Sequence, residues 1–479
     1  MSTAIHTLTV RELSESLARR ELTSVQITTA LLERIDALDP TLHAFVHVTR
    51  ERALAEAQAA DLALAGGRTC GPLHGVPYAV KDLYDVHDLP TAAGCSLLNQ
   101  SRAERDCHAV RSLSRAGMVL LGKTHTVQFA FGGVGINHDT GTPHNPWQQV
   151  PHAPGGSSSG TGVAVASGMA PMALGSDTGG SVRIPASLCG ISGLKTTVGR
   201  ISRAGVYPLS WTLDTVGPLA RTIDDCALVY EALQGADPDG DDTTSGQLPH
   251  DLMSTLGDGV RGLRLAIPET LFWEDVEADV VEKVREAIEV LRSLGANVFE
   301  VPFDLINDLR GAERERLRAM TIAAEAYTIN RQLAENHLDK LDPAVAQRLM
   351  TGNQISGPDY AATVRSWQDM RKQALHEMRD IDALLVPSTM ATAKPIGDID
   401  VDLDSYGVWN AKYLRNTSIG NILNLCGVSV PCGFDHAGSP VGLMVYAKPF
   451  DEGMATRVAH AYQNETKWHT RQPDLGWVG

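Results

Sequence analysis

The sequence predicts an α/β fold, and three observations lead to this class. From Gly71 onward, short apolar runs typical of strands alternate with glycine-rich turns and with segments of helical periodicity. The chain has 479 residues, enough for a large core in one domain or in two fused domains. Hydrophobic residues make up 43% and charged residues 20%, close to the averages of globular proteins, which excludes disordered and fibrous classes.

The N-terminal part of the chain is predicted to be helical. Thr9 and Glu12 have the spacing of a capping box, and apolar residues recur after them on one helical face. A second helix is expected from about Ser24 to Leu38, ending at Asp39-Pro40 because proline disrupts a continuing helix.

The apolar runs predict where the strands lie. Beyond an acidic connector from Asp237 to Ser245, a strand, a helix and another strand follow, so the sheet continues past the connector. The connector departs from a calcium-loop pattern, since its twelfth residue is Leu248 instead of glutamate, and it is interpreted as a solvated loop. The predicted strands are 78–80, 118–121, 263–267, 297–301 and a run within 382–393, with a helical stretch at 311–379 before the last.

The charge balance and the cysteines restrict partners and location. The net charge of -16 disfavours nucleic-acid binding, because that binding rests largely on Lys and Arg neutralising phosphates. The seven cysteines form no CxxC pair, which indicates reduced thiols in a cytosolic protein. The N-terminus lacks the apolar core of a signal peptide, and the longest nearly uncharged stretch, 163–176, is too short to span a bilayer. We therefore expect a cytoplasmic protein without nucleic-acid or membrane partners. A homodimer is one possible oligomeric state.

The segment from Pro154 to Lys195 holds the most informative motif. It contains two Gly-Gly-Ser turns, at 155–157 and 179–181, separated by a run of small residues. Glycine permits the close backbone approach that is needed where N–H groups point into a cavity, so these turns fit an oxyanion-binding site beside a serine nucleophile. A single turn of this kind would be interpreted as a glycine-rich loop, so a second feature is needed.

Lys81 supplies that second feature. It directly follows the short apolar strand 78–80 in the segment GVPYAVKD. A lysine at the end of such a strand can be desolvated, which lowers its pKa toward a range where the neutral amine acts as a base. Alone, this lysine would be interpreted as a surface or ion-paired residue, but beside the serine segment it predicts the base for a serine nucleophile.

Together these motifs resemble the amidase signature family. The matching segments are GVPYAVKD, LLGKT, Asn-Pro-Trp at 145–147, GGSSSG, ALGSDTGGSVRIPA, CGISGLK, LDTVGP at 213–218 and, more loosely, LCGVSVPCG at 425–433. The resemblance covers nearly the whole chain. It implies one domain, 1–479, with a large mixed central β-sheet covered on both faces by α-helices. Its parts would be an N-terminal helical segment at 1–65, a signature core at 71–235 and a helical insertion at 305–380.

The resemblance also implies roles for single residues. Lys81 corresponds to the family's catalytic lysine, Ser157 to a serine held by a cis peptide bond, and Ser181 to the nucleophile. The oxyanion hole corresponds to the backbone N–H groups of Thr178, Gly179, Gly180 and Ser181.

These residue types are chemically consistent with amide hydrolysis. Neutral Lys81 removes the proton of Ser181 through Ser157, whose hydroxyl donates and accepts at once. The proton returns to the leaving amine, and water then hydrolyses the acyl-enzyme. No cluster of metal ligands is visible, so neither a metal nor a cofactor is expected. The charged neighbours Asp177, Arg183 and Asp214 are expected to form an ion-paired frame.

Two other motifs are rejected. Gly117 to Thr124 fits the P-loop pattern, but its apolar middle predicts a strand where phosphate binding needs an open loop. Gly156 to Gly160 fits the nucleophile elbow of α/β-hydrolases, but none of the histidines that would serve as its base has a convincing context.

Two kinds of family member are weighed. The A subunit of glutamyl-tRNA amidotransferase usually has Asp-Glu-Phe after the GKT-like element and Gln after the Arg of GGSIRQP. Here these places hold Thr-Val-Gln-Phe at 126–129 and Ile184. A stand-alone amidase is therefore preferred, and the amidotransferase component is the alternative.

The substrate is predicted to be a small neutral aryl or alkyl amide, because the candidate pocket offers apolar surface without a fixed charge. Arg415 is the one nearby cation, and it keeps a carbamate or a carboxylated urea open as a second option. The residues expected to bind substrate are Gln128, Phe129, Phe131, Gly132, Gly133, Trp409 and Tyr413.

Overall fold

A computed structural model gives the fold of this chain. It describes residues 4–237, 240–269, 271–305 and 312–478, with only the backbone described at 312–318. The described residues form one 11-stranded sheet in the order β1-β3-β2-β4-β6-β5-β10-β11-β9-β7-β8. The sheet is mixed: β2 pairs in parallel with β3 and β4, whereas β4 and β6 pair antiparallel. An α/β fold with a large mixed sheet is therefore confirmed.

The strands are short, and most are buried along their whole length. They are β1 (Phe45–Val48), β2 (Pro77–Lys81), β3 (Val119–Thr124), β4 (Met172–Asp177), β5 (Ser192–Lys195), β6 (Thr215–Ala220), β7 (Arg264–Pro268), β8 (Asn297–Val301), β9 (Ala383–Pro387), β10 (Cys426–Phe434) and β11 (Pro440–Ala447). All five residues of β2 and all six of β4 are buried. This explains why they lack polar alternation, since strands covered on both faces are apolar throughout.

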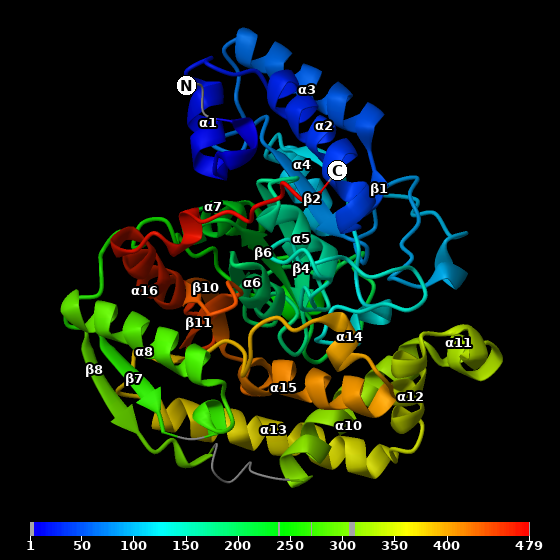
Figure 1. Cartoon of the computed structure of the whole chain (residues 1–479), viewed down its shortest axis with the longest axis vertical. Coiled ribbons are helices and arrows are strands. Elements are labelled where there is room, and N and C mark those ends of the chain that lie inside the picture. The colour runs from blue at the N-terminus through cyan, green and yellow to red at the C-terminus, as the bar shows by residue number, and fades with distance from the viewer. Residues whose placement is uncertain (1–3, 238–239, 270, 306–311, 479) are drawn as a thin grey trace.

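Helices surround the sheet, as Figure 1 shows. They are α1 (Val10–Ala18), α2 (Ser24–Leu42), α3 (Arg50–Ala65), α4 (His108–Arg115), α5 (Ser159–Ala166), α6 (Arg183–Cys189), α7 (Ile223–Leu233), α8 (Ala278–Ser293), α10 (Ala312–Ile329), α11 (Arg331–Asn336), α12 (Pro343–Gly352), α13 (Gly357–Glu377), α14 (Ile396–Ile399), α15 (Leu403–Ile422) and α16 (Glu452–Glu465). In Figure 1, α1, α2 and α3 lie together at the top, and α10, α13 and α15 lie together at the bottom.

The first helices follow the sequence expectation with one correction. Thr9 and Glu12 form the predicted capping box at the start of α1. The end predicted for α2 at Asp39-Pro40 is wrong, because the helix continues to Leu42 and ends at His43 in the left-handed conformation. Pro40 lies in the last turn of the helix, where it lacks the N–H that would donate to the carbonyl four residues earlier. The carboxylate of Asp39 accepts the amides of Ala44 and Phe45 just beyond that turn at 2.7 and 3.1 Å.

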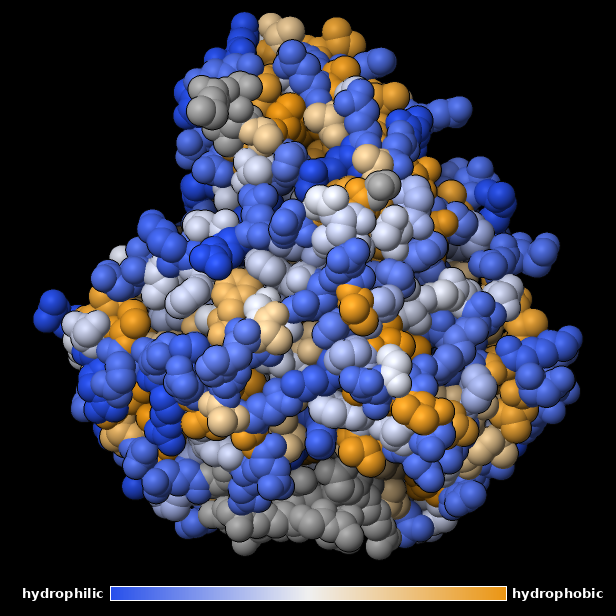
Figure 2. All heavy atoms as spheres, in the orientation of Figure 1, coloured by the Kyte–Doolittle hydropathy of each residue, from blue (hydrophilic) through white to orange (hydrophobic). Residues whose placement is uncertain are grey.

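The segment with the P-loop pattern is strand β3. Its residues are buried and pair with β1 and β2, so they cannot form an open phosphate loop. The strands predicted at 78–80 and 297–301 are β2 and β8. Within the described residues, no helix is long and apolar enough to cross a membrane. In the view of Figure 2, hydrophilic residues cover most of the surface, and apolar residues form small separate groups.

Candidate active site

Lys81 ends strand β2 and has no exposed surface. Its amine Nζ donates to Ser157 Oγ at 2.7 Å and to Ser176 Oγ at 2.9 Å. Burial lowers the pKa of Lys81 to about 7, although the charges of Asp214 and Asp177 act in the opposite direction. Near neutral pH, a substantial part of this amine is unprotonated and able to accept a proton.

Ser157 precedes helix α5 and is fully buried. The peptide bond between Gly156 and Ser157 is cis, as the family resemblance implies. The carbonyl of Ser157 accepts the amide of Val127 at 3.1 Å, which fixes the turn against the neighbouring loop. The hydroxyl of Ser157 therefore faces Lys81 from a rigid backbone.

Sequence reasoning missed Ser176, the second hydroxyl on Lys81. Ser176 lies near the end of β4, which runs parallel to β2 and pairs with it. Parallel neighbours end at the same edge of a sheet, so the ends of β2 and β4 bring Lys81 and Ser176 together. The pairing of β2 with β4 was the missing information, because no local pattern indicates it.

Ser181 lies in the turn between β4 and α6, and 4% of its surface is exposed. The structure shows no hydrogen bond from its hydroxyl to Ser157 or to any other described residue. The structure thus joins Lys81 to Ser157 by a hydrogen bond, whereas no hydrogen bond joins Ser157 to Ser181.

The backbone amides of this turn differ in availability. The amides of Thr178, Gly179 and Ser181 have no acceptor among the residues that the structure describes. The amide of Gly180 donates to Asp177 Oδ1 at 2.9 Å and is already occupied. Gly180 has a φ of +140°, and a Cβ there would lie 2.1 Å from Thr417 Oγ1, so glycine is required.

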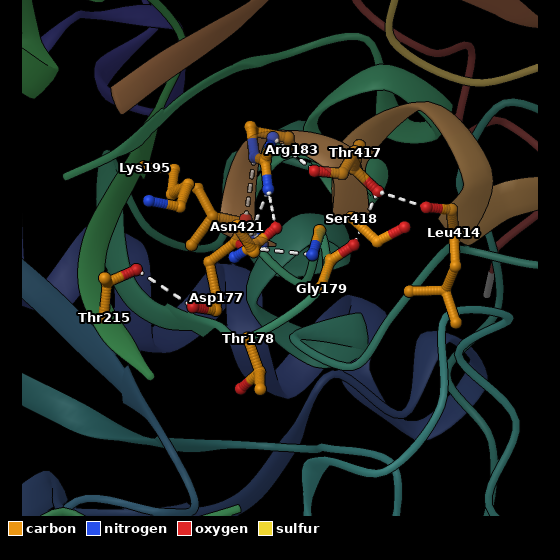
Figure 3. A network of polar contacts seen from close by, with 12 residues as sticks. Asp177, Thr178, Gly179, Arg183, Lys195, Thr215, Leu414, Thr417, Ser418 and Asn421 are labelled. Atoms are coloured by element: carbon orange, nitrogen blue, oxygen red, sulfur yellow. Dashed lines mark hydrogen bonds and ion pairs between the residues drawn. The ribbon is translucent and has the colours of Figure 1, made fainter. Parts of the chain in front are cut away.

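Asp177 and Arg183 form the predicted frame around this turn. Arg183 Nη2 and Nε donate to the two carboxylate oxygens of Asp177 at 2.9 and 3.0 Å, with both side chains fully buried. Burial alone would raise the pKa of Asp177, but the charge and hydrogen bonds of Arg183 lower it to about 2. Asn421 and Thr417 of α15 join this network, as Figure 3 shows.

Asp214, the third expected member, is bound differently. It accepts the Thr178 hydroxyl and the amides of Leu209 and Ser210, the latter two at 2.9 and 3.0 Å. Burial raises the pKa of Asp214. Asp214 thus fixes the start of the turn instead of pairing with Arg183.

A cavity of about 170 Å³ adjoins the turn at Gly179. Among the described residues its wall is apolar apart from a few groups, one of which is the cation of Arg348. The Arg348 guanidinium lies 4.0 Å from the ring centre of Phe131 and donates to the Phe131 carbonyl. The lining residues are Phe131, Gly179, Ala319, Ile322, Ala323, Arg348, Thr351, Asn410, Leu414 and Ser418.

Of the pocket residues expected from segment 128–133, Phe131 lines this cavity. Gln128 is fully buried, and its side chain accepts the Asp342 amide and donates to Asp139, both at 3.0 Å. Phe129 is also buried and stacks on Tyr207. Gly132 and Gly133 lie behind the wall, where the amide of Gly133 donates to Asn410 at 2.7 Å.

The aromatic residues expected on α15 lie outside the lining of the cavity. Tyr413 is buried and donates to the Thr392 carbonyl at 3.0 Å, and Trp409 packs against it. Arg415 is also buried and donates to Asn416. The cavity meets a different face of α15, which carries Asn410, Leu414 and Ser418, spaced four residues apart.

Comparison with known proteins decides the family. The Amidase family model matches residues 26–455. The chain belongs to the amidase signature family. The A subunit of glutamyl-tRNA(Gln) amidotransferase from Chloroflexus aggregans is 39% identical over 99% of both chains. The 2-amino-5-chloromuconic acid deaminase of Comamonas testosteroni is 36% identical over 94% of this chain and 95% of that protein.

Solved structures agree with this assignment. The peptide amidase from Stenotrophomonas maltophilia is similar with a TM-score of 0.82 and 29% identity, covering 98% of each chain. The resemblance inferred from the motifs is confirmed, and the amidase family and its structures support a hydrolase of carbon–nitrogen bonds.

Proposed function

We propose that this amidase-family chain hydrolyses an amide through an acyl-enzyme on Ser181, with Lys81 as base and Ser157 as proton relay. The observation that carries the proposal is the buried Lys81 amine, 2.7 Å from Ser157 Oγ. Burying an amine that forms no hydrogen bond to a carboxylate of the described residues costs stability, which supports a functional role for this lysine. Its pKa of about 7 suits a base that works near neutral pH.

The reaction then proceeds in two halves. Lys81 takes the proton of Ser157 as Ser157 takes that of Ser181, and Ser181 Oγ bonds to the carbonyl carbon. The negative oxygen of the tetrahedral intermediate binds the amides of Gly179 and Ser181, which have no other acceptor among the described residues. The C–N bond breaks as the proton returns through Ser157 to the nitrogen. Water attacks the ester by the same route and releases a carboxylic acid.

Covalent labelling tests this chemistry without a known substrate. A fluorophosphonate probe should add to Ser181, as intact mass and peptide mapping would show. The Ser158→Ala variant is the matched control, because Ser158 is a buried serine of the neighbouring turn whose hydroxyl contacts the backbone of Ser176. Labelling of the Ser181→Ala variant at wild-type rate would exclude Ser181 as nucleophile.

For the acyl group of the substrate, the cavity favours an anionic chain over the neutral one predicted from sequence. Arg348 places a cation in a wall whose other described residues are mostly apolar. A carboxylate of the substrate would there gain a charge-assisted hydrogen bond, worth about 1.5–3 kcal/mol. We therefore propose a small amide whose acyl chain ends in a carboxylate.

A pair of p-nitroanilides separates the two substrate classes. Glutaryl-p-nitroanilide carries the carboxylate, and pentanoyl-p-nitroanilide replaces it by a methyl group. We expect kcat/KM to favour the glutaryl compound by about tenfold or more, and Arg348→Gln to remove that preference. Arg331→Gln, at an exposed arginine of α11, should keep it. A preference for the pentanoyl compound in the wild type would restore the neutral-amide prediction.

The A component of a tRNA amidotransferase is the second candidate. The observation that favours it is the full-length similarity to the Chloroflexus aggregans protein. The sequence at 126–129 and Ile184 favour the stand-alone enzyme. Turnover by the purified chain alone supports a stand-alone amidase, whereas activity that requires a second, co-expressed protein supports the second candidate.

We also propose a cytoplasmic location. All seven cysteines are unpaired, and six are buried, which fits a reducing compartment. Titration of seven free thiols in unfolded protein purified without reductant would agree with this, and recovery of fewer would contradict it.

A further inference from the structure

His138 lies between two carboxylates from distant parts of the chain. Its Nδ1 is 2.9 Å from Asp342 Oδ2, and its Nε2 is 2.8 Å from Asp400 Oδ2. The backbone amide of His138 also donates to Asp342 Oδ2 at 2.8 Å. Ionised carboxylates only accept, and only a protonated imidazole donates from both ring nitrogens, so this geometry favours the charged form of His138.

Each carboxylate belongs to a segment that lines the substrate cavity. Asp342 caps helix α12 by accepting the amide of Ala344 at 2.9 Å, and α12 carries Arg348 into the cavity. Asp400 is the C-cap residue of α14 and lies three residues before the start of α15, which carries Asn410 and other lining residues.

His138 itself follows the third segment, 128–134, which contributes Phe131 to the wall. This segment meets the start of α12 a second time, because Gln128 accepts the amide of Asp342 at 3.0 Å. Three segments therefore meet at one imidazole, and His138 lies 204 and 262 residues before Asp342 and Asp400 in sequence.

We infer that His138 is a positioning residue that fixes the three walls of the cavity, and thereby sets the affinity for the acyl group of the substrate. Because Arg348 lies in the second turn of α12, a shift of the start of this helix moves its guanidinium relative to Ser181. His138 does not line the cavity and touches none of the proposed reacting atoms, so its loss acts on KM. This inference rests on the proposed function.

The charge of His138 makes its two hydrogen bonds, to Asp342 and Asp400, sensitive to pH. Hydrogen bonding to Asp342 raises the pKa of His138 to about 9, against the effect of its partial burial. Tyr406 also faces the imidazole, at 6.3 Å between ring centres, and burial raises its pKa out of this range. The stabilisation by these two hydrogen bonds is therefore fully present below the ordinary histidine pKa of 6.5, and it is lost as pH rises through about 9.

Steady-state kinetics with glutaryl-p-nitroanilide test the inference. His138→Ala should raise KM about tenfold while kcat changes less than about twofold, since misplacement of a binding group weakens binding first. His138→Arg should restore the low KM, because a guanidinium also donates to two carboxylates, and should keep it at about pH 9.5, where the wild-type KM rises. His436→Ala is the control, since His436 pairs with Asp279 at 2.7 Å on the surface and lines no cavity.

Two further measurements separate the possible failures. Fluorophosphonate labelling of Ser181 should proceed at the same rate in His138→Ala and wild type. If the wild type is not labelled, the proposed function fails; if it is labelled and KM is unchanged in His138→Ala, the role of His138 alone fails. Amide hydrogen exchange in the first turn of α12 needs no substrate, and it should accelerate in His138→Ala but not in His436→Ala. Unchanged exchange there would overturn the inference.

Discussion

Asp177 and Arg183 hold the turn of Ser181 from both ends. Asp177 is the last residue of β4 and Arg183 the first of α6, and their side chains meet through two hydrogen bonds of 2.9 and 3.0 Å. Arg183 also donates to the Thr417 carbonyl and the Asn421 side chain of α15. The strand, the turn and the cavity helix thus share one buried ion pair.

Breaking this pair should destabilise the fold strongly. Asp177→Asn leaves the Arg183 guanidinium buried without its counter-charge, which costs about 3–5 kcal/mol. Urea unfolding at neutral pH measures this loss, and Arg331→Met, at an exposed pair on α11, should cause no measurable change. Because the pKa of Asp177 is lowered to about 2 in the folded chain, the carboxylate contributes to the free energy of unfolding above pH 3.8. This contribution is lost as pH falls through about 2. A variant as stable as the wild type would contradict this role.

Ser181→Ala should reduce kcat/KM by at least about 10³-fold, because nucleophile and base act as a unit. The residual rate should not fall much further in the double variant with Lys81→Ala. Thermal unfolding should show that both variants fold. Additive losses in the double variant would mean that the two residues act independently.

The activity should rise with pH through about 7, the pKa of Lys81. The base must be neutral to accept a proton, so activity is low where the amine is charged and reaches its plateau above the pKa. A profile of kcat/KM between about pH 5 and pH 8 measures this limb below the pKa of about 9 of His138. An activity that falls across this range would exclude a lysine base.

Lys81→Met should stabilise the fold while removing activity. In the wild type the pKa of Lys81 is about 7 when folded and 10.5 in its ordinary state, so the unfolded chain binds the additional proton between these values. Wild-type stability therefore rises with pH over this interval. The advantage of the variant should reach up to about 4 kcal/mol near pH 7 and shrink toward pH 10.5. A variant less stable than the wild type at pH 7 would show that burial of the Lys81 amine does not lower the stability of the fold.

Local patterns were sufficient for five of the eleven strands in the described residues, β2, β3, β7, β8 and β9, but not for the end of α2. The apolar run before Lys81 and the turns around Ser157 and Ser181 are contiguous in sequence, so their chemistry is readable there. Ser176 and Arg348 were not predictable in the same way. Ser176 reaches Lys81 through the pairing of β2 with β4, and Arg348 reaches the cavity through the docking of α12, and both depend on tertiary contacts.

Which face of α15 lines the cavity could not be predicted from the sequence either. Trp409 and Tyr413 were predicted to bind substrate because they offer aromatic surface. A rotation of α15 by about one residue decides which side chains face the cavity. Buried contacts fix this rotation, among them the hydrogen bond that Asn421 donates to Asp177. Sequence periodicity cannot fix that rotation, because both faces of α15 are partly apolar.

The last prediction tests which face of α15 meets the substrate. Leu414 lies against the turn and the rear wall, since a Cβ on Gly179 or Gly133 would be 3.3 or 2.8 Å from its side chain. Leu414→Trp should therefore fill part of the cavity of about 170 Å³ and exclude long acyl chains. We expect the ratio of kcat/KM for pentanoyl- over acetyl-p-nitroanilide to fall about tenfold or more, the size of a typical overpacking penalty. Trp409→Leu, on the face away from the cavity, should leave this ratio unchanged. If instead Trp409→Leu changes the ratio and Leu414→Trp does not, the acyl group binds on the aromatic face.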